Sequence, residues 1–527
     1  MKSIYLTLLT LLLFGCTGNN EPPEVPPFED QNISIVEKMK IAISEAYIAQ
    51  IGLPDSTIQF LKSYYEARSF TPRWINDSTL TESGEKLKII FNEVYSIGIP
   101  EGRTIRCNTE NYIQDEINIT LSLAQVVYDL EHGIIDYDSV EVKPINFVNP
   151  LDLDELVVFD ESEDFRYQFL KFGPQDTTYD VLGRGLIEML DTYPLDTSTF
   201  QVKSIKYDTT MAVEKARVAL VSKGYLEENT KDSTGIAEGI TKFQEDNGLK
   251  PDAVIGKYTS QALNESTYRK VERIILAMDK IRTRKKRPEK YIYINIPEYT
   301  LRLYVNDSLK SVNNIVVGKY ENQTPELTSK LKKIVVYPYW NVPYSISSKE
   351  ILPAVKYNTN YLEKHNYKVL KGEEEIDPYT VNWKSIRQNS FPYKIRQEPG
   401  PKNSLGVIKF DFYNKHSVYF HDTPAKSLFS VDVRAYSHGC MRTQHPVDLA
   451  KMILKYDSTS PRRVNTMRPD SLDSLLGVEF ENYEVRLIDA IPIFIEYQTV
   501  TRKGKDKMTV YLDIYGRDEE YLELLRQ

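Results

Sequence analysis

Two histidines lie close enough in the sequence to one cysteine to activate it. His421 is followed by Asp-Thr-Pro, and His438 begins a His-Gly-Cys-Met-Arg run that contains Cys440. A thiol with a pKa of about 8.5 is only a few per cent thiolate at neutral pH, so a catalytic cysteine needs a neighbouring base or cation. We therefore expect Cys440 to act as a nucleophile and His421 to accept its proton, if the fold brings them together.

The residues around these groups favour such a site. The Asp-Thr-Pro turn after His421 ends a strand pattern and would aim the imidazole out of the sheet edge. Gly439 permits an unusual turn and a close approach of the backbone, so consecutive N–H groups can point at a developing oxyanion. His438 matters in this arrangement for its backbone position more than for its imidazole.

The elements that must position these residues have the two-residue period of β-strands. Short strand patterns bounded by Gly, Pro and Asn favour a β-sandwich or a barrel. The strands are predicted at residues 291–296, 300–304, 315–317, 333–337, 407–413, 418–421, 484–487, 491–497 and 508–514. Residues 350–400 are polar and aromatic without strand alternation, which predicts either a mobile lid over a cleft or a passive surface excursion.

The first half of the chain has helical periodicity instead. Apolar residues recur at three-residue steps along residues 120–130, and residues 33–205 are predicted to form a mostly helical domain. Residues 206–268 are predicted to form a small three-helix module, with an Asn-Gly-Leu cap after its second helix. Because 527 residues are too many for one ordinary core, we predict a multidomain α+β protein.

The first sixteen residues have the pattern of a processing signal. Lys2 precedes an apolar run that is too short to cross a bilayer and ends in Leu-Phe-Gly-Cys. This ending resembles a bacterial lipoprotein cleavage box, so acyl chains on Cys16 would anchor a periplasmic protein to a membrane, with the outer membrane favoured by Thr17. The acidic, proline-rich residues 17–32 would be a linker. A plain membrane helix is the alternative.

Composition limits the partners of the chain. A net charge of −9 argues against nucleic acid or an anionic membrane surface as a partner, because those need clustered Lys and Arg. An oxidising compartment would permit a disulfide between Cys107 and Cys440. A single bridge adds little to a chain with a large core, and catalysis explains Cys440 better. We expect no metal and no cofactor.

The catalytic motif and its surroundings resemble the L,D-transpeptidase catalytic domain. The resemblance rests on the Ser-His-Gly-Cys-Met-Arg run at 437–442 and on the His-Asp-Thr-Pro that begins nineteen residues before the cysteine, 440 minus 421. Further matching segments lie at 323–325, 339–343, 398–401, 403–406 and 513–518. The likeness covers residues 290–520 closely and the helical half, including Arg73-Trp74, more loosely.

The resemblance also predicts how the domains are arranged. It is strongest to the large multidomain branch of the family, in which a capping subdomain is inserted into the catalytic domain. The catalytic domain would span residues 269–527, with the cap at about 350–400. The module at 206–268 resembles the three-helix peptidoglycan-binding domain, or else is only a spacer. Ala253 stands where that domain usually has glycine, which puts the turn geometry there in question.

The resemblance implies a role for each motif residue. Cys440 is the nucleophile, His421 its proton acceptor, and the backbone carbonyl of Asp422 the group that orients the imidazole. The amides of Gly439 and Cys440, with the His438 segment, form the oxyanion hole.

Four more residues are expected to contact the substrate. Arg442 would hold either the motif loop or a substrate carboxylate, for which its fork geometry is suited. Tyr419, Trp340 and Asn341 would line the cleft, with core packing as the alternative for Tyr419 and Trp340.

The implied reaction moves acyl groups between peptidoglycan stem peptides. A donor tetrapeptide acylates Cys440 and loses D-alanine, and the side-chain amine of an acceptor stem takes the acyl group to form a 3→3 cross-link. With water in place of the amine, the enzyme is an L,D-carboxypeptidase. A non-catalytic wall-binding lipoprotein with an inherited fold is a further alternative. The sequence does not predict an oligomeric state.

Two other chemistries have partial support in the sequence. The side chains that could form a metal site are His421, Asp422, His438, Cys440 and His445. No two of the histidines have the His-x-x-x-His spacing of zinc hydrolases, which argues against such a site. His445 is better placed at the start of a helix that runs through Leu454. Residues 83–86 match the Ser-x-x-Lys of penicillin-binding proteins, but no Lys-Thr-Gly or Ser-Asp-Asn follows them.

Overall fold

The protein forms two compact units. The computed structural model describes residues 33–44, 54–105, 111–156, 160, 162–457, 467–478 and 480–527. The predicted lipidation site Cys16, the linker at 17–32 and Cys107 lie outside these residues. The first unit contains the chain up to Lys285 with Thr499–Val510 and Gly516–Gln527, and the second contains Lys286–Gln498 with Tyr511–Tyr515.

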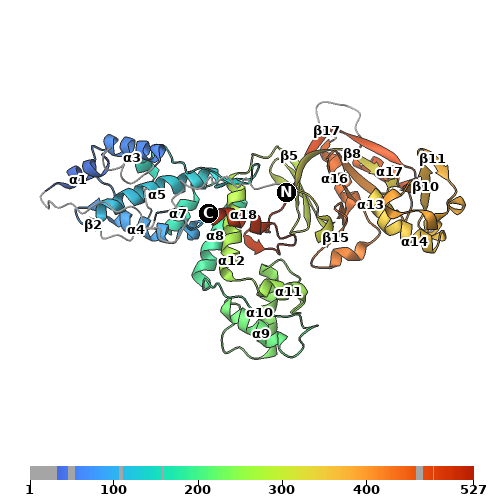
Figure 1. Ribbon diagram of the computed structural model, residues 1–527, viewed down its shortest axis with the longest axis horizontal. Helices are drawn as coiled ribbons and strands as arrows, with labels where there is room; N and C mark the ends of the chain where they lie inside the picture. The colour runs from blue at the N-terminus through green and yellow to red at the C-terminus, as the bar shows by residue number, and fades with distance from the viewer. Residues whose placement is uncertain are drawn as a thin grey trace, which may run out of the picture. The chain divides into compact units, whose positions relative to one another are not determined.

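The helical part of the first unit is built around α5 (Tyr112–His132), most of whose residues are buried. The side chain of Asn111 caps its first amides, and Gly133 ends it with a φ of 71°. Glu116 on this helix accepts a hydrogen bond of 2.7 Å from the backbone amide of the fully buried Trp74. Around α5 lie α1 (Ile35–Ala42), α3 (Asp55–Ala67), α4 (Glu82–Asn92), α7 (Phe165–Leu170), α8 (Thr177–Thr192), α12 (Thr267–Arg282) and short hairpins β1–β2 (Ile75–Asn76, Thr79–Leu80) and β3–β4 (Ile135–Asp136, Glu141–Val142) (Figure 1). No helix in the described part of the chain is both long and apolar enough to cross a membrane.

The predicted three-helix module consists of α9 (Ala212–Ser222), α10 (Ser233–Asp246) and α11 (Lys257–Leu263), which gather in one bundle (Figure 1). The buried Gln244 organises the turn between α10 and α11. Its Oε1 accepts the amides of Asp252 and Ala253 at 3.0 and 2.9 Å, and its Nε2 donates to the Val254 carbonyl at 3.0 Å. Ala253 adopts a φ of 58°, so it keeps the left-handed conformation that glycine favours.

The second unit contains a closed barrel, which is one of the two architectures that the sequence predicted. Its sheet has the order β15-β7-β16-β14-β13-β8-β17-β5-β6, and pairing of β6 with β7 closes an eight-stranded ring with β15 added outside it. The strands are β5 (Lys290–Asn295), β6 (Thr300–Val305), β7 (Ser308–Gly318), β8 (Leu327–Val336), β13 (Ile408–Phe412), β14 (Phe420–His421), β15 (Ala435–Ser437), β16 (Met441–Thr443) and β17 (Tyr483–Glu496). The multidomain α+β fold is confirmed.

Alternation along β13 shows which residues face the barrel interior. Ile408, Phe410 and Phe412 are buried, and the Phe410 ring stacks 4.6 Å from that of Phe420 on β14. Lys409 and Asp411 therefore point to the outer face, because successive side chains on a strand alternate. His421 pairs directly with Lys409 and lies on that same face.

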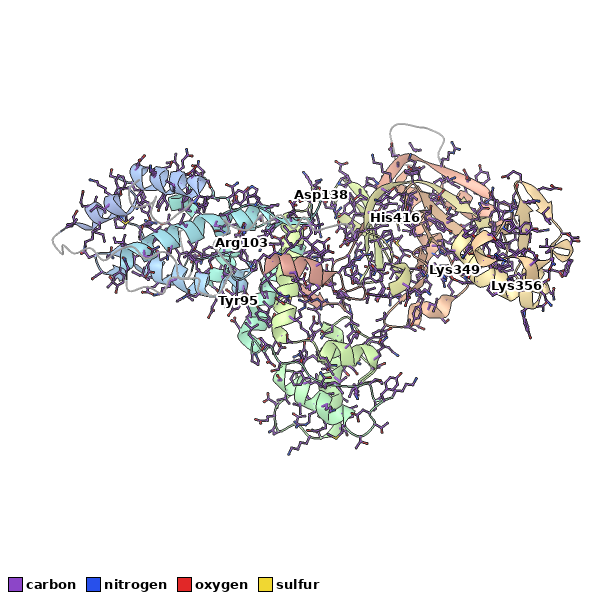
Figure 2. The ribbon with its side chains drawn as sticks, in the orientation of Figure 1. Tyr95, Arg103, Asp138, Lys349, Lys356 and His416 are labelled. Carbon is purple, nitrogen blue, oxygen red and sulfur yellow. The ribbon has the colours of Figure 1, made fainter. Side chains whose placement is uncertain are left out.

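An insertion covers part of the outer face and has its own core, made of residues such as Leu362, Val369 and Trp383. It begins at β9 (Trp340–Asn341), ten residues before the predicted start, because β9 pairs with β12 (Lys394–Gln397) at its far end. Its other elements are α13 (Tyr344–Ile346), the π-helical turn η3 (Ser347–Ile351), α14 (Leu352–Tyr357), α15 (Asn360–Lys364), β10 (Tyr367–Lys371) and β11 (Glu374–Ile376). Lys349 and Lys356 project from its helical side (Figure 2). The sequence did not predict its strands, which are too short for clear alternation.

Segments at both ends of the predicted catalytic domain lie in the first unit instead. The N-terminal segment is α12; the C-terminal ones are the β18–β19 hairpin (Val500–Lys503, Lys507–Val510) and α18 (Asp518–Leu525). Arg273 of α12 donates to Asp518 at 3.0 Å, and the side chains are only 3% and 1% exposed. Because a buried charge must be paired, this contact ties α18 to α12.

The conformation of Ala253 predicts an unusual response to glycine. Ala253→Gly removes the steric cost of a left-handed residue and should stabilise the module by about 0.5–1 kcal/mol. Hydrogen exchange of residues 236–263 in the full chain measures this. The matched control Ala237→Gly, inside α10, should destabilise the same segment by about 0.5–1 kcal/mol. Equal effects of the two glycines would contradict the assignment.

Candidate active site

The candidate site is assembled by two short parallel strands. In the β14–β16 pair, Phe420 lies opposite Met441 and His421 opposite Arg442. The amide of Met441 donates to the Tyr419 carbonyl at 3.0 Å, which fixes the residue before it beside Tyr419. The pairing thus places Cys440 opposite Tyr419 and His421 two positions further along, so that His421 and Cys440, nineteen positions apart in the sequence, lie on the same face of neighbouring strands.

The imidazole of His421 is held in one orientation. Its Nδ1 forms a short contact with the backbone carbonyl of Asp422, the contact that the family resemblance implied. A carbonyl only accepts, so Nδ1 carries the proton and Nε2 keeps its lone pair. The pKa of His421 is lowered to about 3, chiefly by burial and also by the charges of Arg442 and Lys409, while the hydrogen bond to the Asp422 carbonyl acts in the opposite direction. The ring is therefore neutral at pH 7.

The thiol of Cys440 is neutral as well. Burial raises its pKa above the ordinary thiol value, while hydrogen bonding from Tyr419 and the charges of Lys409 and Arg442 act in the opposite direction. The Tyr419 ring also lies 5.6 Å from the His421 ring, so this tyrosine contacts both groups. No hydrogen bond among the described residues joins the thiol directly to the imidazole. Catalytic hydrogen bonds often tighten only when substrate binds.

The turn before Cys440 differs from the expected oxyanion hole. The Gly439 amide donates to the Ser437 hydroxyl at 3.1 Å, and that hydroxyl donates to the Cys440 carbonyl. Thr324 donates to the Gly439 carbonyl at 2.9 Å. The Gly439 amide is therefore occupied, whereas the Cys440 amide has no hydrogen-bond partner among the described residues. Ser437 had no role in the sequence interpretation, although serine is a common turn residue whose hydroxyl can bond nearby backbone groups.

The Asp422 carboxylate has a separate, structural role. It accepts the Val407 amide at 2.9 Å and pairs with Lys426 at 2.5 Å. Gly406 lies against it with a φ of 61°, and a Cβ there would come within 2.2 Å of the carboxylate. The glycine thus lets the 403–407 turn close onto Asp422.

Arg442 is the only residue of the motif with an unpaired charge in the described part of the chain. Its side chain is half-buried, and no described carboxylate or carbonyl accepts from it. Burial lowers its pKa from the ordinary arginine value, and the nearby Cys440 acts in the opposite direction. In the described part of the chain the guanidinium does not hold the motif loop, and its second predicted role, binding a substrate carboxylate, stays a prediction.

Of the three predicted cleft residues, Tyr419 and Trp340 contact each other and Asn341 stands apart. Trp340 and Asn341 form β9 of the insertion. Burial raises the pKa of Tyr419, and hydrogen bonding from Trp340 opposes that rise. Trp340 is half-buried and Asn341 is exposed, so the insertion meets the catalytic sheet mainly through Trp340.

A second contact joins the insertion to the motif loop. The His438 Nε2 lies 2.7 Å from an Oε1 of Glu350 on η3. The imidazole of His438 therefore also takes part in the structure, although the sequence analysis gave its backbone position more weight than its imidazole. Sequence spacing could not reveal this contact, because Glu350 lies 88 residues earlier.

Within the described ranges, no three His, Cys, Asp or Glu side chains gather as metal ligands. Residues 83–86 lie on α4, where Lys86 pairs with Glu82 at 2.9 Å.

Comparisons with known proteins show what this part of the chain is similar to. Residues 289–465 match the model of the L,D-transpeptidase catalytic domain. A curated protein of Haemophilus influenzae, named "Putative L,D-transpeptidase", is 33% identical over 230 residues. That region is 44% of this chain and 45% of the relative, so the chain spans about half the length of the curated relative it matches.

The opposing effects on Cys440 predict its reactivity with pH. Its alkylation by iodoacetamide should have an inflection above the ordinary thiol range, because burial raises the pKa. Tyr419→Phe removes a stabilising hydrogen bond and should move the inflection up by about 0.5–1 pH unit. Tyr413→Phe, on an exposed ring, is the control. An inflection unchanged by Tyr419→Phe would exclude the proposed contact.

Proposed function

We propose that the L,D-transpeptidase catalytic domain of this protein transfers acyl groups between peptidoglycan stem peptides through a thioester on Cys440. One observation carries the proposal. The β14–β16 register places the Cys440 thiol on the same face as an imidazole whose Nδ1 is held by a carbonyl, so that Nε2 is free to accept a proton. Activation of a nucleophile by an oriented base is the general requirement for covalent acyl transfer.

In the first step, the Cys440 thiol attacks the carbonyl of the third stem residue as its proton passes to His421 Nε2. The Cys440 amide stabilises the oxyanion, and Arg442 binds the carboxylate of the terminal D-alanine. The amide bond then breaks, and His421 returns the proton to the amine of the departing D-alanine. Because both groups are neutral at rest, the proton moves during the attack rather than before it.

In the second step, the side-chain amine of an acceptor stem attacks the thioester. His421 takes the amine proton, the carbon–sulfur bond breaks, and the proton returns to the sulfur. The product is a 3→3 cross-link. Water in place of the amine gives the L,D-carboxypeptidase reaction.

Two further proposals concern the location of the protein and its binding to the cell wall. We propose that lipid on Cys16 holds the protein in the periplasm at a membrane. We also propose that the 206–268 module binds the glycan. A groove of about 640 Å³ on the module, with exposed Tyr207 in its lining, is the candidate sugar site.

The proposal predicts that formation of 3→3 dimers depends on the sulfur atom of Cys440. Tetrapeptide muropeptides incubated with the full-length protein should give 3→3 dimers and free D-alanine, detected by mass spectrometry. Cys440→Ala should abolish both. The control Ser83→Ala should keep them, since Ser83 belongs to the rival serine motif. Dimers from Cys440→Ala would end the mechanism, and a wild type without dimers that still releases D-alanine would establish the carboxypeptidase.

A further inference from the structure

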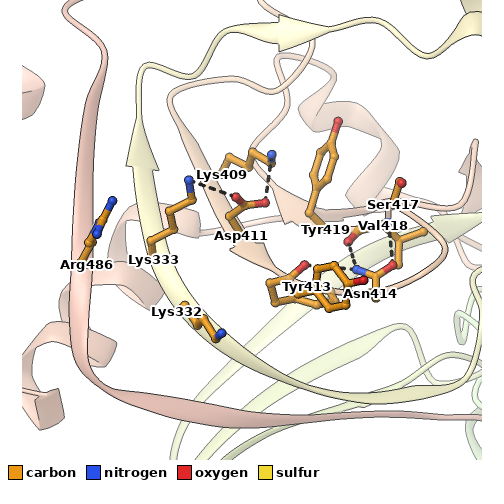
Figure 3. Close-up of a pocket in the computed structure, with 11 residues that line it drawn as sticks. Lys332, Lys333, Lys409, Asp411, Tyr413, Asn414, Ser417, Val418, Tyr419 and Arg486 are labelled. Carbon is orange, nitrogen blue, oxygen red and sulfur yellow. Dashed lines mark hydrogen bonds and ion pairs between the residues drawn. The ribbon is translucent and has the colours of Figure 1, made fainter.

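A cationic groove continues from the candidate site across the outer face of the barrel. It encloses about 620 Å³ and is lined by residues of β8, β13 and β17 and of the 413–419 segment. Figure 3 shows Lys332, Lys333, Lys409 and Arg486 around it. We call the groove that these four side chains line the lysine groove.

Strand register explains why these charges share one face. Lys333 on β8 lies directly opposite both Asp411 on β13 and Arg486 on β17, and opposed residues project to the same side. Lys332 would normally point to the other side. The register shifts next to it on both edges of β8, and such a bulge re-aims a side chain, so that both lysines line the groove.

The groove carries more positive charge than its own acids neutralise. Lys333 pairs with Asp411 at 3.4 Å and Glu484 at 2.6 Å, and Lys409 pairs with the same Asp411 at 3.1 Å. Lys332 and Arg486 have no ion-pair partner in the described part of the chain. Two carboxylates thus face four cations, on a protein whose net charge is −9.

Lys409 connects this groove to the reacting groups. It lies directly across from His421, and its Nζ is 4.2 Å from the centre of the Tyr419 ring. Arg442 lies on the other side of His421, because the strand order is β16-β14-β13-β8-β17. Two separate cationic positions therefore flank the base. A reaction between two peptides has two substrates to hold, and each of these positions can serve one of them.

We propose that the lysine groove binds the free carboxylates of the acceptor stem peptide, with Arg442 serving the donor. This rests on the function proposed above. β14 and β17 are three strand spacings apart in the sheet, which is about 14 Å. Lys333 lies two residues along β8 from Val335, the partner of Lys409, which is about 7 Å along the strand. An extended stem of four or five residues spans about 13–17 Å, so its carboxylates reach the groove while its amine lies at Cys440.

The test uses binding, so that it is independent of catalysis. Full-length Cys440→Ala protein is titrated with a stem tetrapeptide that has free carboxylates, and with the same tetrapeptide amidated. Adding Lys332→Ala and Arg486→Ala together should raise Kd for the free tetrapeptide about tenfold, because two charge-assisted contacts are lost. Neither residue leaves a described partner unpaired, so the fold should persist. The control Lys330→Ala, an exposed lysine of β8 outside the groove, should leave Kd unchanged.

Amidation should weaken binding to the parent protein by a similar factor and have little further effect on the double variant. Equal Kd values for the parent and the double variant, or no saturable binding by the parent, would overturn the groove assignment. Failure of the proposed function is recognised separately, because it appears as absence of D-alanine release by the protein with Cys440 intact.

Discussion

The parallel pairing of β14 with β16 is the interaction on which the site depends. Only two residues of each strand pair, yet their register sets Cys440 beside Tyr419 and His421 across from Arg442. A slip of one residue would turn every side chain to the opposite face and bury the histidine in the barrel. Neighbouring hydrogen bonds hold both strands in this register. After β14, the Asp422 carboxylate accepts the Val407 amide of the 403–407 turn. Before β16, the hydroxyls of Ser437 and Thr324 donate to carbonyls of the motif loop.

Burial on the outer face of the barrel determines the electrostatics. The insertion covers this face, and Trp340 and Glu350 bring it onto Tyr419 and His438. In this environment neither the thiol nor the imidazole is charged at rest. Lys409 and Arg442 instead supply positive charge, which favours the thiolate and disfavours the imidazolium. The arrangement is suited to transfer of the Cys440 proton to His421 during attack on the substrate carbonyl, when the bound substrate has displaced water.

Short-range sequence signals predicted much of this structure. The two-residue period of the strands predicted a β-sandwich or a barrel, of which the structure has the barrel, and the spacing of His421, Gly439 and Cys440 predicted a candidate site whose residues the structure places on neighbouring strands. Contacts between distant segments could not be predicted in the same way. The His438–Glu350 contact, the β9–β12 pairing that starts the insertion early, and the Arg273–Asp518 pair that returns α18 to the first unit all depend on packing. Ala253 was recognised from sequence, but only its φ shows that the glycine-like turn is retained.

Acylation by a carbapenem tests the central claim most directly, because it requires the nucleophile and the base but no acceptor. Intact-mass measurements on the full-length protein should show one added carbapenem, located on Cys440. His421→Gln should slow this acylation by about 10² to 10⁴ fold, the usual contribution of a general base. Acylation of His421→Gln at the wild-type rate, or no adduct on Cys440, would contradict the account.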